Sequence, residues 1–391
     1  MDKIRLGVIG TGSVVREIYR HLYFHSDYSH LLSIEAVADP NDKAVSEFAD
    51  PYGIPANRRF SDYREMIRRV QLDAVQVNTP DQLHREPTVF ALENGLDVMV
   101  AKPLAASVTD AHAMIEAAGK AGRLITVDFH KREDPRIKEV ATRYRDGAYG
   151  KFQLAVLYML DKLCVADPNH QPRYFASPDF CEKNSPITFL TVHMADALVN
   201  MVSLKPVSVR ATAFSQKLPS LRPVPSKGYD MCDVEVLLEN GGIAHIVTGW
   251  HLPDTAHSMT VQSSRLICTD AMIDLAIDMP GCREITAEGI VERNPLFRNF
   301  EVDGTVSGYG MSHPGKLYQE ILRARNRKVS PEELNRMMGP FELGFYATAI
   351  CEAAEVSLQK GRPIDGVTRG SEIDVADLLR RRIGNAADRY M

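Results

Sequence analysis

The feature that most constrains this chain is a short apolar run near its start that ends in glycines. Residues 3–15 read K-I-R-L-G-V-I-G-T-G-S-V-V and begin as a run of strand length. Gly10 would allow a tight turn, and Gly12 would let the backbone approach a phosphate group closely. Ser13 and Val14 then begin a segment whose apolar residues recur at helical spacing. A strand, a glycine turn and a helix in this order predict a dinucleotide-binding unit, in which free amides at the helix start face a pyrophosphate.

An acidic residue farther along the chain supports this prediction. The pattern is G-x-G-x-x-V, because Val15 stands where a third glycine would serve helix packing more than phosphate contact. A second apolar strand, residues 34–38, ends at Asp39, whose carboxylate could accept hydrogen bonds from both ribose hydroxyls of an adenosine. Asp39 would repel a 2′-phosphate, which predicts NAD rather than NADP as the cofactor. The alternative is an aspartate that only initiates a turn before Pro40.

Strands and helices alternate through the first third of the chain. Further apolar strands are expected at residues 74–78, 97–100 and 124–127, and segments with helical spacing separate them. This alternation is typical of a parallel, doubly wound sheet with helices between the strands. We therefore expect a first domain that occupies residues 1–130.

The pattern changes after residue 130. A helix and a long strand are followed by a polar loop, and strand signals then dominate residues 207–275. Helices are expected after residue 314, where they could pack back on the first domain. We expect residues 131–391 to form an α/β domain with an open, mostly antiparallel sheet, so that the fold class is α/β with two domains.

Composition excludes several classes of protein. The chain has 391 residues, too many for one typical core, and its formal net charge of −5 does not favour binding to nucleic acid or to an anionic membrane. The first residues lead directly into a core strand, and no apolar run approaches membrane-spanning length, so we expect neither a signal peptide nor a membrane helix. The six cysteines are scattered, which predicts free thiols in a reducing cytoplasm and no zinc site.

A series of short motifs resembles the Gfo/Idh/MocA oxidoreductase family. The matching segments, in chain order, are L-G-V-I-G-T-G (6–12), V-A-D-P (37–40), V-N-T-P-D-Q-L-H (77–84), A-L-E-N-G-L-D-V-M-V-A-K-P (91–103), H-K-R-E-D-P (130–135), H-M-A-D (193–196) and E-V-L-L-E-N-G-G-I-A (235–244). The resemblance implies a Rossmann domain followed by a domain whose open sheet builds a dimer or tetramer interface. It also implies hydride transfer between NAD(P) and a hydroxyl of a sugar, a sugar derivative or a cyclitol.

The resemblance implies two catalytic residues. Lys102 follows the carboxyl end of a strand, where it could contact the cofactor, position the substrate oxygen and stabilise a developing alkoxide. His193 matches the family's catalytic histidine and could take the hydroxyl proton. Without the resemblance, Lys102 could be a solvated loop residue and His193 a buried core residue. Asp196, on the same helix face as His193, either orients the imidazole or serves local polarity.

Further residues are expected around the cofactor and the substrate. The resemblance places Thr79 and Pro80 against the cofactor together with His84, for which a surface position on a helix is an equally good interpretation. Three potential cations, His130, Lys131 and Arg132, could meet an anionic or hydroxylated substrate or form ion pairs between the domains.

The sequence departs from the family pattern at three positions. The usual E-K-P reads A-K-P at residues 101–103, and the Asn that often follows T-P is Asp81. Phe189 stands where many members carry an aspartate, four residues before the histidine. An aromatic ring there would suit an apolar sugar face or an aglycone. Two alternatives to a dehydrogenase therefore stay open: an NAD-dependent glycosidase that oxidises its sugar only transiently, and a nucleotide-binding regulator without turnover.

Overall fold

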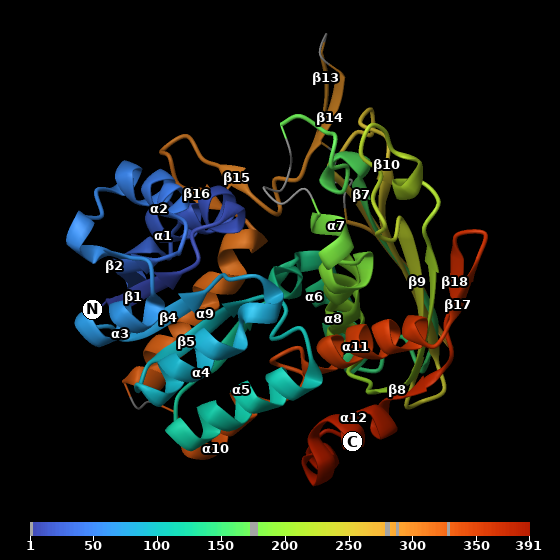
Figure 1. Cartoon of the computed structure of the whole chain (residues 1–391). Coiled ribbons are helices and arrows are strands. Elements are labelled where there is room, and N and C mark those ends of the chain that lie inside the picture. Colours follow the sequence, from blue (N-terminus) through green and yellow to red (C-terminus); the bar gives the residue numbers. More distant parts are fainter. Residues whose placement is uncertain (1–2, 173–178, 278–281, 287–288, 327–328) are drawn as a thin grey trace. The chain divides into compact units, whose positions relative to one another are not determined.

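The structure is a computed structural model that describes residues 3–172, 179–277, 282–286, 289–326 and 329–391. The chain divides into two units (Figure 1). The first comprises residues 1–134 and 296–348, and the second comprises residues 135–295 and 349–391. Residues 296–348, which the sequence pattern places in the second domain, thus pack in the first unit.

A six-stranded parallel sheet forms the centre of the first unit, in the order β3-β2-β1-β4-β5-β6. Its strands are mostly short runs of Val, Ile, Leu and Ala buried on both faces, as expected where helices cover a parallel sheet. The strands are β1 (Ile4–Ile9), β2 (Leu32–Ala38), β3 (Arg59–Phe60), β4 (Ala74–Val77), β5 (Asp97–Ala101) and β6 (Ile125–Asp128).

Helices pack on both faces of this sheet. Met66 of α3 lies against Gly7 on one face, whereas Tyr23 of α1 and Tyr318 of α9 reach Gln76 on the other. The helices of this unit are η1 (Val15–Tyr19), α1 (Arg20–Phe24), α2 (Asp42–Ala49), α3 (Tyr63–Arg69), α4 (Arg85–Glu93), α5 (Val108–Ala121), α9 (Tyr309–Arg325) and α10 (Pro331–Met337). Shorter helical turns and strands are η2 (Ser29–Leu31), η3 (Asp50–Tyr52), η4 (Ala56–Arg58), η5 (Asp81–Leu83), η6 (His130–Glu133), β15 (Asn299–Phe300) and β16 (Val306–Ser307).

A nine-stranded mixed sheet forms the centre of the second unit. Its order is β12-β11-β7-β10-β9-β8-β18-β17, with β19 paired to β8, and its neighbours are antiparallel except for the parallel pair β7 and β10. The strands are β7 (Phe152–Lys162), β8 (Pro206–Phe214), β9 (Met231–Leu238), β10 (Ile243–Leu252), β11 (Thr260–Cys268), β12 (Met272–Ala276), β17 (Arg362–Ile364), β18 (Val367–Arg369) and β19 (Ile373–Asp374). Separately, β13 (Cys282–Thr286) pairs antiparallel with β14 (Gly289–Arg293).

The helices of the second unit include one segment that carries several of the predicted site residues. Residues 187–202 form η8 (Ile187–Thr191) and α8 (Val192–Val202) without a break, and α8 packs on α6 and β7. The other helices are α6 (Pro135–Arg145), η7 (Leu163–Val165), α7 (Phe180–Lys183), η9 (Leu218–Ser220), α12 (Val375–Ile383) and η10 (Gly384–Arg389), together with α11 (Phe345–Gln359), most of which follows the division of the chain after residue 348.

The predicted fold class is confirmed, with differences in detail. In the region where strand signals dominate, residues 260–268 form one continuous strand, β11, because the polar residues 262–265 lie in the same ladder with β7. Helix α9 begins at Tyr309 and contains Pro314, which the sequence pattern places at the helix start. Of the six cysteines, five are buried free thiols, and the side chain of Cys282 lies outside the described residues.

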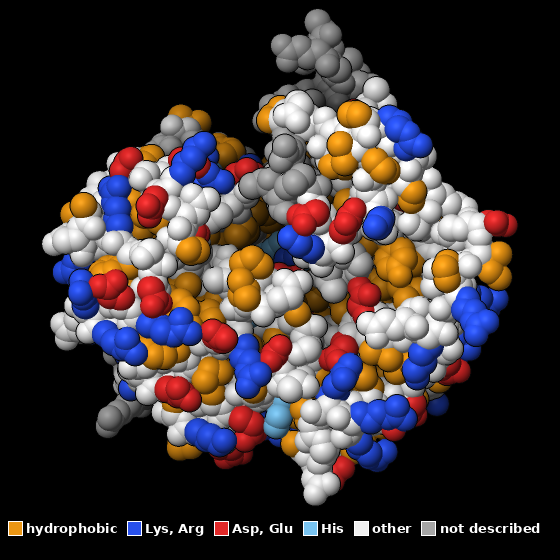
Figure 2. Space-filling view, in the orientation of Figure 1, with side chains coloured by type: hydrophobic (Ala, Val, Ile, Leu, Met, Phe, Trp, Pro, Cys, Tyr) orange, Lys and Arg blue, Asp and Glu red, His pale blue; other side chains and the backbone are white. Residues whose placement is uncertain are grey.

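The surface bears both signs of charge. On the face that Figure 2 shows, Lys and Arg side chains are interspersed with Asp and Glu. Among the described residues, no helix combines the length and the apolar character needed to cross a membrane.

Candidate functional site

The turn after β1 has the geometry that a dinucleotide site requires. Gly10 has a φ of +84°, and a Cβ atom there would lie 2.8 Å from the carbonyl oxygen of Asn78, so only glycine fits without strain. A Cβ atom on Gly12 would meet nothing within 4 Å, which leaves open space where a pyrophosphate could approach. Val15 is fully buried, in agreement with its expected role in helix packing. The turn therefore fits a bound dinucleotide.

Asp39 connects this turn to the end of β2. Its Oδ2 accepts a hydrogen bond from the Thr11 amide (2.8 Å), and its Oδ1 accepts one from the Asn41 amide (2.8 Å). The side chain is half-buried, and a carboxylate has further lone pairs that can accept ribose hydroxyls. Asp39 thus holds the glycine turn in place and keeps acceptor capacity for an adenosine ribose.

His84 is a buried link between two loops at the same sheet edge. Its residue is fully buried, and its ring nitrogens lie 2.9 Å from the carbonyl oxygens of Thr79 and Pro103. Burial lowers the pKa of this imidazole, against the smaller opposing effect of Asp81. The alternative of a surface histidine is therefore wrong, because the ring joins the loop after β4 to the loop after β5. The exposed Pro80 and half-buried Thr79 lie above it, and contact of these residues with the cofactor stays a prediction.

Lys102 follows β5 at the edge where the glycine turn and Asp39 follow β1 and β2. Because the carboxyl ends of parallel strands meet at one edge, the fold brings these residues to one edge of the first unit. Lys102 is half-buried. Its positive charge is one of the influences that lower the pKa of His130, after burial and after Lys131 and His313. The lysine therefore lies within electrostatic range of η6.

The three expected cations of η6 have different surroundings. Burial lowers the pKa of His130 to about 3, so that its ring, packed against Phe297 and Tyr309, is neutral at pH 7. The expectation that His130 is a cation is therefore wrong. Lys131 is buried, at 3% exposure. Arg132 donates hydrogen bonds to the carbonyl oxygens of residues 341 and 342, at 2.7 and 2.6 Å, and thereby holds this segment.

A buried polar cluster next to these residues was not foreseen. Asp128, the last residue of β6, is 3% exposed, and it accepts hydrogen bonds from the Tyr19 hydroxyl and from Nδ1 of His313, both at 2.8 Å. Burial alone would raise the pKa of Asp128, but the contacts with His313 and Tyr19 and the nearby His130 hold it below its ordinary value. A lone aspartate at the end of an apolar parallel strand is the feature of the sequence that could have indicated it.

Three predicted residues of the second unit lie on the continuous helical segment 187–202. Phe189 packs in an aromatic cluster with Phe180 and Trp250, at centroid distances of 5.3 and 6.0 Å. His193 is half-buried, and Asp196 is buried at 2% exposure. Lys102 belongs to the first unit and His193 to the second, and each unit is described by itself. The catalytic roles of both residues therefore stay predictions.

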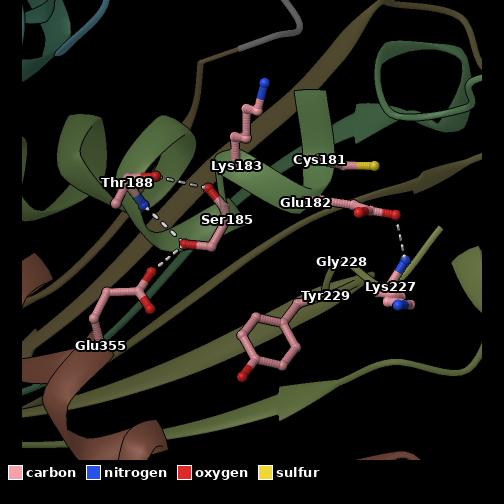
Figure 3. A pocket seen from close by; sticks show the side chains of 9 residues that line it. All are labelled: Cys181, Glu182, Lys183, Ser185, Thr188, Lys227, Gly228, Tyr229 and Glu355. Atoms are coloured by element: carbon pink, nitrogen blue, oxygen red, sulfur yellow. Dashed lines mark hydrogen bonds between the residues drawn. The ribbon is translucent and has the colours of Figure 1, made fainter. Parts of the chain in front are cut away.

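A pocket in the second unit borders the start of this helical segment, as Figure 3 shows. It has a volume of about 350 Å³, and neither Phe189 nor His193 lines it. The Ser185 hydroxyl donates a hydrogen bond to Glu355, and Ser185 Oγ accepts one from the Thr188 amide. Burial raises the pKa of Glu355, although the contact with Ser185 opposes this. The ring of Tyr229 also lines this pocket.

One group of potential metal ligands also comes together in the second unit. A ligand atom from each of Cys164, His170 and Asp254 lies within 4.8 Å of the other two. The spacing of these residues in the sequence gave no indication of such a group. Burial and the Asp254 carboxylate raise the pKa of the Cys164 thiol, which opposes the thiolate that a metal requires.

Comparison with known proteins adds the following findings. A family model described as "Oxidoreductase family, NAD-binding Rossmann fold" matches residues 4–129. The chain is 33% identical over 364 residues to an inositol 2-dehydrogenase of Rhodococcus jostii, with 86% of each chain covered. It is 26% identical over 259 residues to a D-glucoside 3-dehydrogenase of Escherichia coli, with 64% of this chain and 71% of the relative covered. The match to an inositol 2-dehydrogenase of Rubrobacter xylanophilus, 31% identical over 150 residues, covers 38% of this chain and 42% of that relative.

Two solved structures share the fold over nearly the whole chain. Scyllo-inositol dehydrogenase of Lactobacillus casei, with bound NAD(H) and scyllo-inositol, has a TM-score of 0.68 at 14% identity and covers 94% of this chain and 99% of its own. Aldose-aldose oxidoreductase of Caulobacter crescentus, complexed with glycerol, has a TM-score of 0.66 at 20% identity and covers 95% of this chain and 100% of its own. At these identities the likeness concerns the fold.

Proposed function

The chain belongs to the Gfo/Idh/MocA oxidoreductase family, and on this premise we propose that it is an NAD-dependent enzyme acting on a hydroxyl of a sugar, a sugar derivative or a cyclitol. The observation that carries the proposal is the sheet edge of the first unit, where Gly12, Asp39 and Lys102 follow three parallel strands. Relatives named as dehydrogenases of inositol and of D-glucoside support the class of substrate.

The first unit is an NAD-binding Rossmann domain, and its residues fit the parts of that cofactor. The amides of Ser13 and Val14, beside the open space at Gly12, would hold the pyrophosphate. Asp39 would accept the adenosine ribose hydroxyls, and its charge disfavours the 2′-phosphate of NADP. NAD supplies the hydride chemistry when it is bound.

Two side chains are proposed to act on the substrate hydroxyl. The ammonium group of Lys102 would donate a hydrogen bond to the reacting oxygen and stabilise negative charge that develops there. The imidazole of His193 would take the hydroxyl proton during oxidation and return it during reduction. Lys131, Arg132, Phe189 and Asp196 would then contact or orient the rest of the substrate, and the charge of Arg132 suits an anionic substituent.

The test is a panel of free inositols, hexoses and sugar acids with stoichiometric NAD, followed by absorbance at 340 nm. Net reduction of NAD by a member of the panel is expected, with turnover lost in His193→Ala by a factor of about 10²–10⁴. Asn200→Ala, on the same helix, is the matched control and should keep wild-type turnover. If His193→Ala lowers thermal stability and spares specific activity, His193 is structural.

The same panel separates the two alternative functions. Aryl glycosides with catalytic NAD would release their aglycone without accumulation of NADH if the enzyme oxidises its sugar only transiently. Tight NAD binding without turnover of any sugar or glycoside would instead favour a regulator. If a free inositol reduces NAD efficiently and stoichiometrically while glycosides do not react, the protein is an ordinary dehydrogenase and the glycosidase alternative is excluded.

We further infer that the protein forms a dimer or tetramer through the open face of the mixed sheet. Leu154 and Tyr158 of β7 are 36% and 39% exposed, and Ile243, the register partner of Leu154 on β10, is 36% exposed. Apolar side chains that are partly exposed on neighbouring strands favour burial against a second copy. Light scattering should show a smaller assembly for Tyr158→Glu and no change for Leu83→Glu, an exposed leucine of the first unit. An unchanged mass for Tyr158→Glu would contradict this inference.

A further inference from the structure

Asp128 is a buried carboxylate at the edge of the parallel sheet where the carboxyl ends of the strands meet, called the strand-end edge below. Residues of two other elements hold it there. Tyr19, on the helix that follows the glycine turn, donates its hydroxyl hydrogen to Oδ2, and Nδ1–H of His313 on α9 donates to Oδ1, each at 2.8 Å. Both oxygens are therefore fixed, and the side chain is 3% exposed. Such an arrangement costs desolvation energy that the partners must offset, so a position of this kind calls for an explanation.

The register of the sheet places Asp128 beside the predicted catalytic lysine. Asp128 is the β6 partner of Ala101, the last residue of β5, and Lys102 is the next residue of the chain. The charges of Asp128 and Lys102 both act on His130, in opposite directions. Asp128, His130 and Lys102 therefore form one electrostatic cluster within the first unit.

A second cation, Lys131, disfavours the charged form of Lys102 unless an anion offsets its effect. Lys131 is 3% exposed and, like Lys102, acts on His130. Two ammonium groups in a partly dehydrated site disfavour each other's charged form. The lowered pKa of His130 keeps its imidazole from adding a third positive charge at pH 7. The titratable groups around Asp128 are Tyr19, Tyr23, His130, His313 and Tyr318, so that Asp128 is the carboxylate among these described residues.

We propose that Asp128 is a positioning residue for Lys102: its carboxylate, fixed by Tyr19 and His313, keeps the Lys102 ammonium charged and holds it at the strand-end edge. The hydrogen bond from Tyr19 also connects the Asp128 carboxylate to the helix that follows the glycine turn. The importance of the charge for catalysis rests on the proposed function. The charge itself can be measured without any substrate.

The experiment measures how fast the Lys102 amine reacts. The full chain is methylated with formaldehyde and cyanoborohydride at pH 8, with and without NAD, and the modification of Lys102 is followed by peptide mass spectrometry. Only the uncharged amine reacts, so loss of a nearby carboxylate should accelerate the reaction. In Asp128→Asn we expect a rate on the order of tenfold higher than in wild type, because a unit charge several ångströms away at an intermediate dielectric has an effect of this size.

The chain offers a matched control on the same sheet. Asp97 is also buried, at 2% exposure, but lies at the opposite end of the strands, at the start of β5. Asp97→Asn should leave the methylation rate of Lys102 unchanged. A folded Asp128→Asn protein in which Lys102 reacts at the wild-type rate would overturn the proposal, as would an equal acceleration in Asp97→Asn.

Two further variants keep the test decisive. Ala101→Glu in the Asp128→Asn background returns a carboxylate to the directly adjacent position, and the methylation rate should fall back toward that of wild type. If Asp128→Asn does not fold, His313→Gln removes one of the two fixing contacts and should accelerate Lys102 by about two- to threefold. An unchanged rate in folded His313→Gln would then count against the proposal.

The outcome is independent of the proposed function. Lys102 accelerated as expected, in a protein that turns over no sugar of the panel, would support the positioning role and contradict the enzymatic one. If the wild-type protein turns over a sugar of the panel and the Lys102 rate is unaltered in Asp128→Asn, the enzymatic role is supported and the positioning role is contradicted.

Discussion

Two buried aspartates, Asp97 and Asp128, lie at opposite ends of neighbouring strands in the parallel sheet and have opposite electrostatic behaviour. Their exposures are nearly equal, at 2% and 3%. Burial raises the pKa of Asp97 to about 6, because the Leu124 amide is its hydrogen-bond donor and Oδ2 has no partner. The pKa of Asp128 lies below its ordinary value despite the same penalty from burial, because His313 and Tyr19 donate to both oxygens.

The set of hydrogen-bond donors, and not the depth of burial, therefore decides whether each of these carboxylates stays charged. Asp73 supports this, since it lies on the same edge as Asp97 and yet has a lowered pKa. Burial would raise that pKa, but Arg5 and Arg325 donate to its carboxylate. In this protein the strand-end edge, with the glycine turn and Lys102, has an anion that is fixed by two elements. That anion is therefore suited to act on the site.

The largest effect is expected from removal of the positive charge of Lys102. Lys102→Met keeps most of the length of the side chain and removes its ammonium group, so turnover should fall by about 10²–10³-fold while NAD affinity changes by only a few-fold. Steady-state kinetics with a substrate from the panel and NAD titration measure the two effects. Lys120→Met, an exposed lysine near the end of α5, is the control that should change neither. Turnover retained in Lys102→Met would remove this residue from the mechanism.

The next effect concerns the contribution of Asp97 to the stability of the protein, which is lost as the pH rises. Its pKa in the folded protein, about 6, exceeds the ordinary 3.8, so the folded state binds the proton more tightly than the unfolded state. The resulting stabilisation is fully present below pH 3.8 and is lost as the pH rises through 6. Relative to wild type, Asp97→Asn should therefore gain about 2 kcal/mol in free energy of unfolding between pH 4 and pH 8. Urea unfolding at the two pH values measures this gain, and a pH-independent difference would contradict it.

A smaller effect is expected for the cofactor at the same strand-end edge. Asp39→Ala removes the charge that disfavours a 2′-phosphate, so the ratio of NADP to NAD affinity should rise by about tenfold or more. Affinity for NAD should fall too, because the variant loses the hydrogen bond that fixes the Thr11 amide. Titration of both cofactors into wild type and variant measures the ratio. Equal affinity of the wild-type protein for NADP and NAD would contradict the assignment of Asp39.

The strand-end edge was in large part predictable from sequence, because a parallel sheet brings every residue that follows a strand to one place. Gly10, Asp39 and Lys102 could be assigned in this way from their positions after apolar runs. Asp128 follows the same rule but has no local motif, and its partner His313 is 185 residues away. The sequence pattern also predicts a helix that starts at Pro314, which leaves His313 outside it, whereas α9 begins at Tyr309.

The second unit was predictable as a fold class and less so in detail. Buried residues alternate with more exposed ones along β9 and through most of β10, and such alternation produces the strand signals of residues 207–275. A mixed sheet has no single edge where loops converge, so sequence order does not predict which side chains meet. The contact of Ser185, in the connection between α7 and η8, with Glu355 of α11 joins residues that are 170 positions apart and could not be foreseen.

The smallest effect separates the two tyrosines that follow the glycine turn. Tyr19 donates to the charged Asp128, and Tyr23 donates to the neutral amide of Gln76 at 2.6 Å. Hydrogen bonds to charged groups contribute more, so Tyr19→Phe should cost about 1 kcal/mol more in free energy of unfolding than Tyr23→Phe. Urea unfolding at pH 7 measures the difference.

Unfolding at low pH should distinguish the same two variants, Tyr19→Phe and Tyr23→Phe. The stabilisation from the low pKa of Asp128 is present above pH 3.8 and is lost as the pH falls through its folded value. Tyr19→Phe removes one of the contacts that lower this pKa, so acid unfolding should begin at a higher pH than in wild type. Tyr23→Phe leaves both donors to Asp128 in place and should unfold at the wild-type pH. If the two variants unfold in acid together, then Tyr19 does not help to keep Asp128 charged, and the fixed anion beside Lys102 depends on His313 alone.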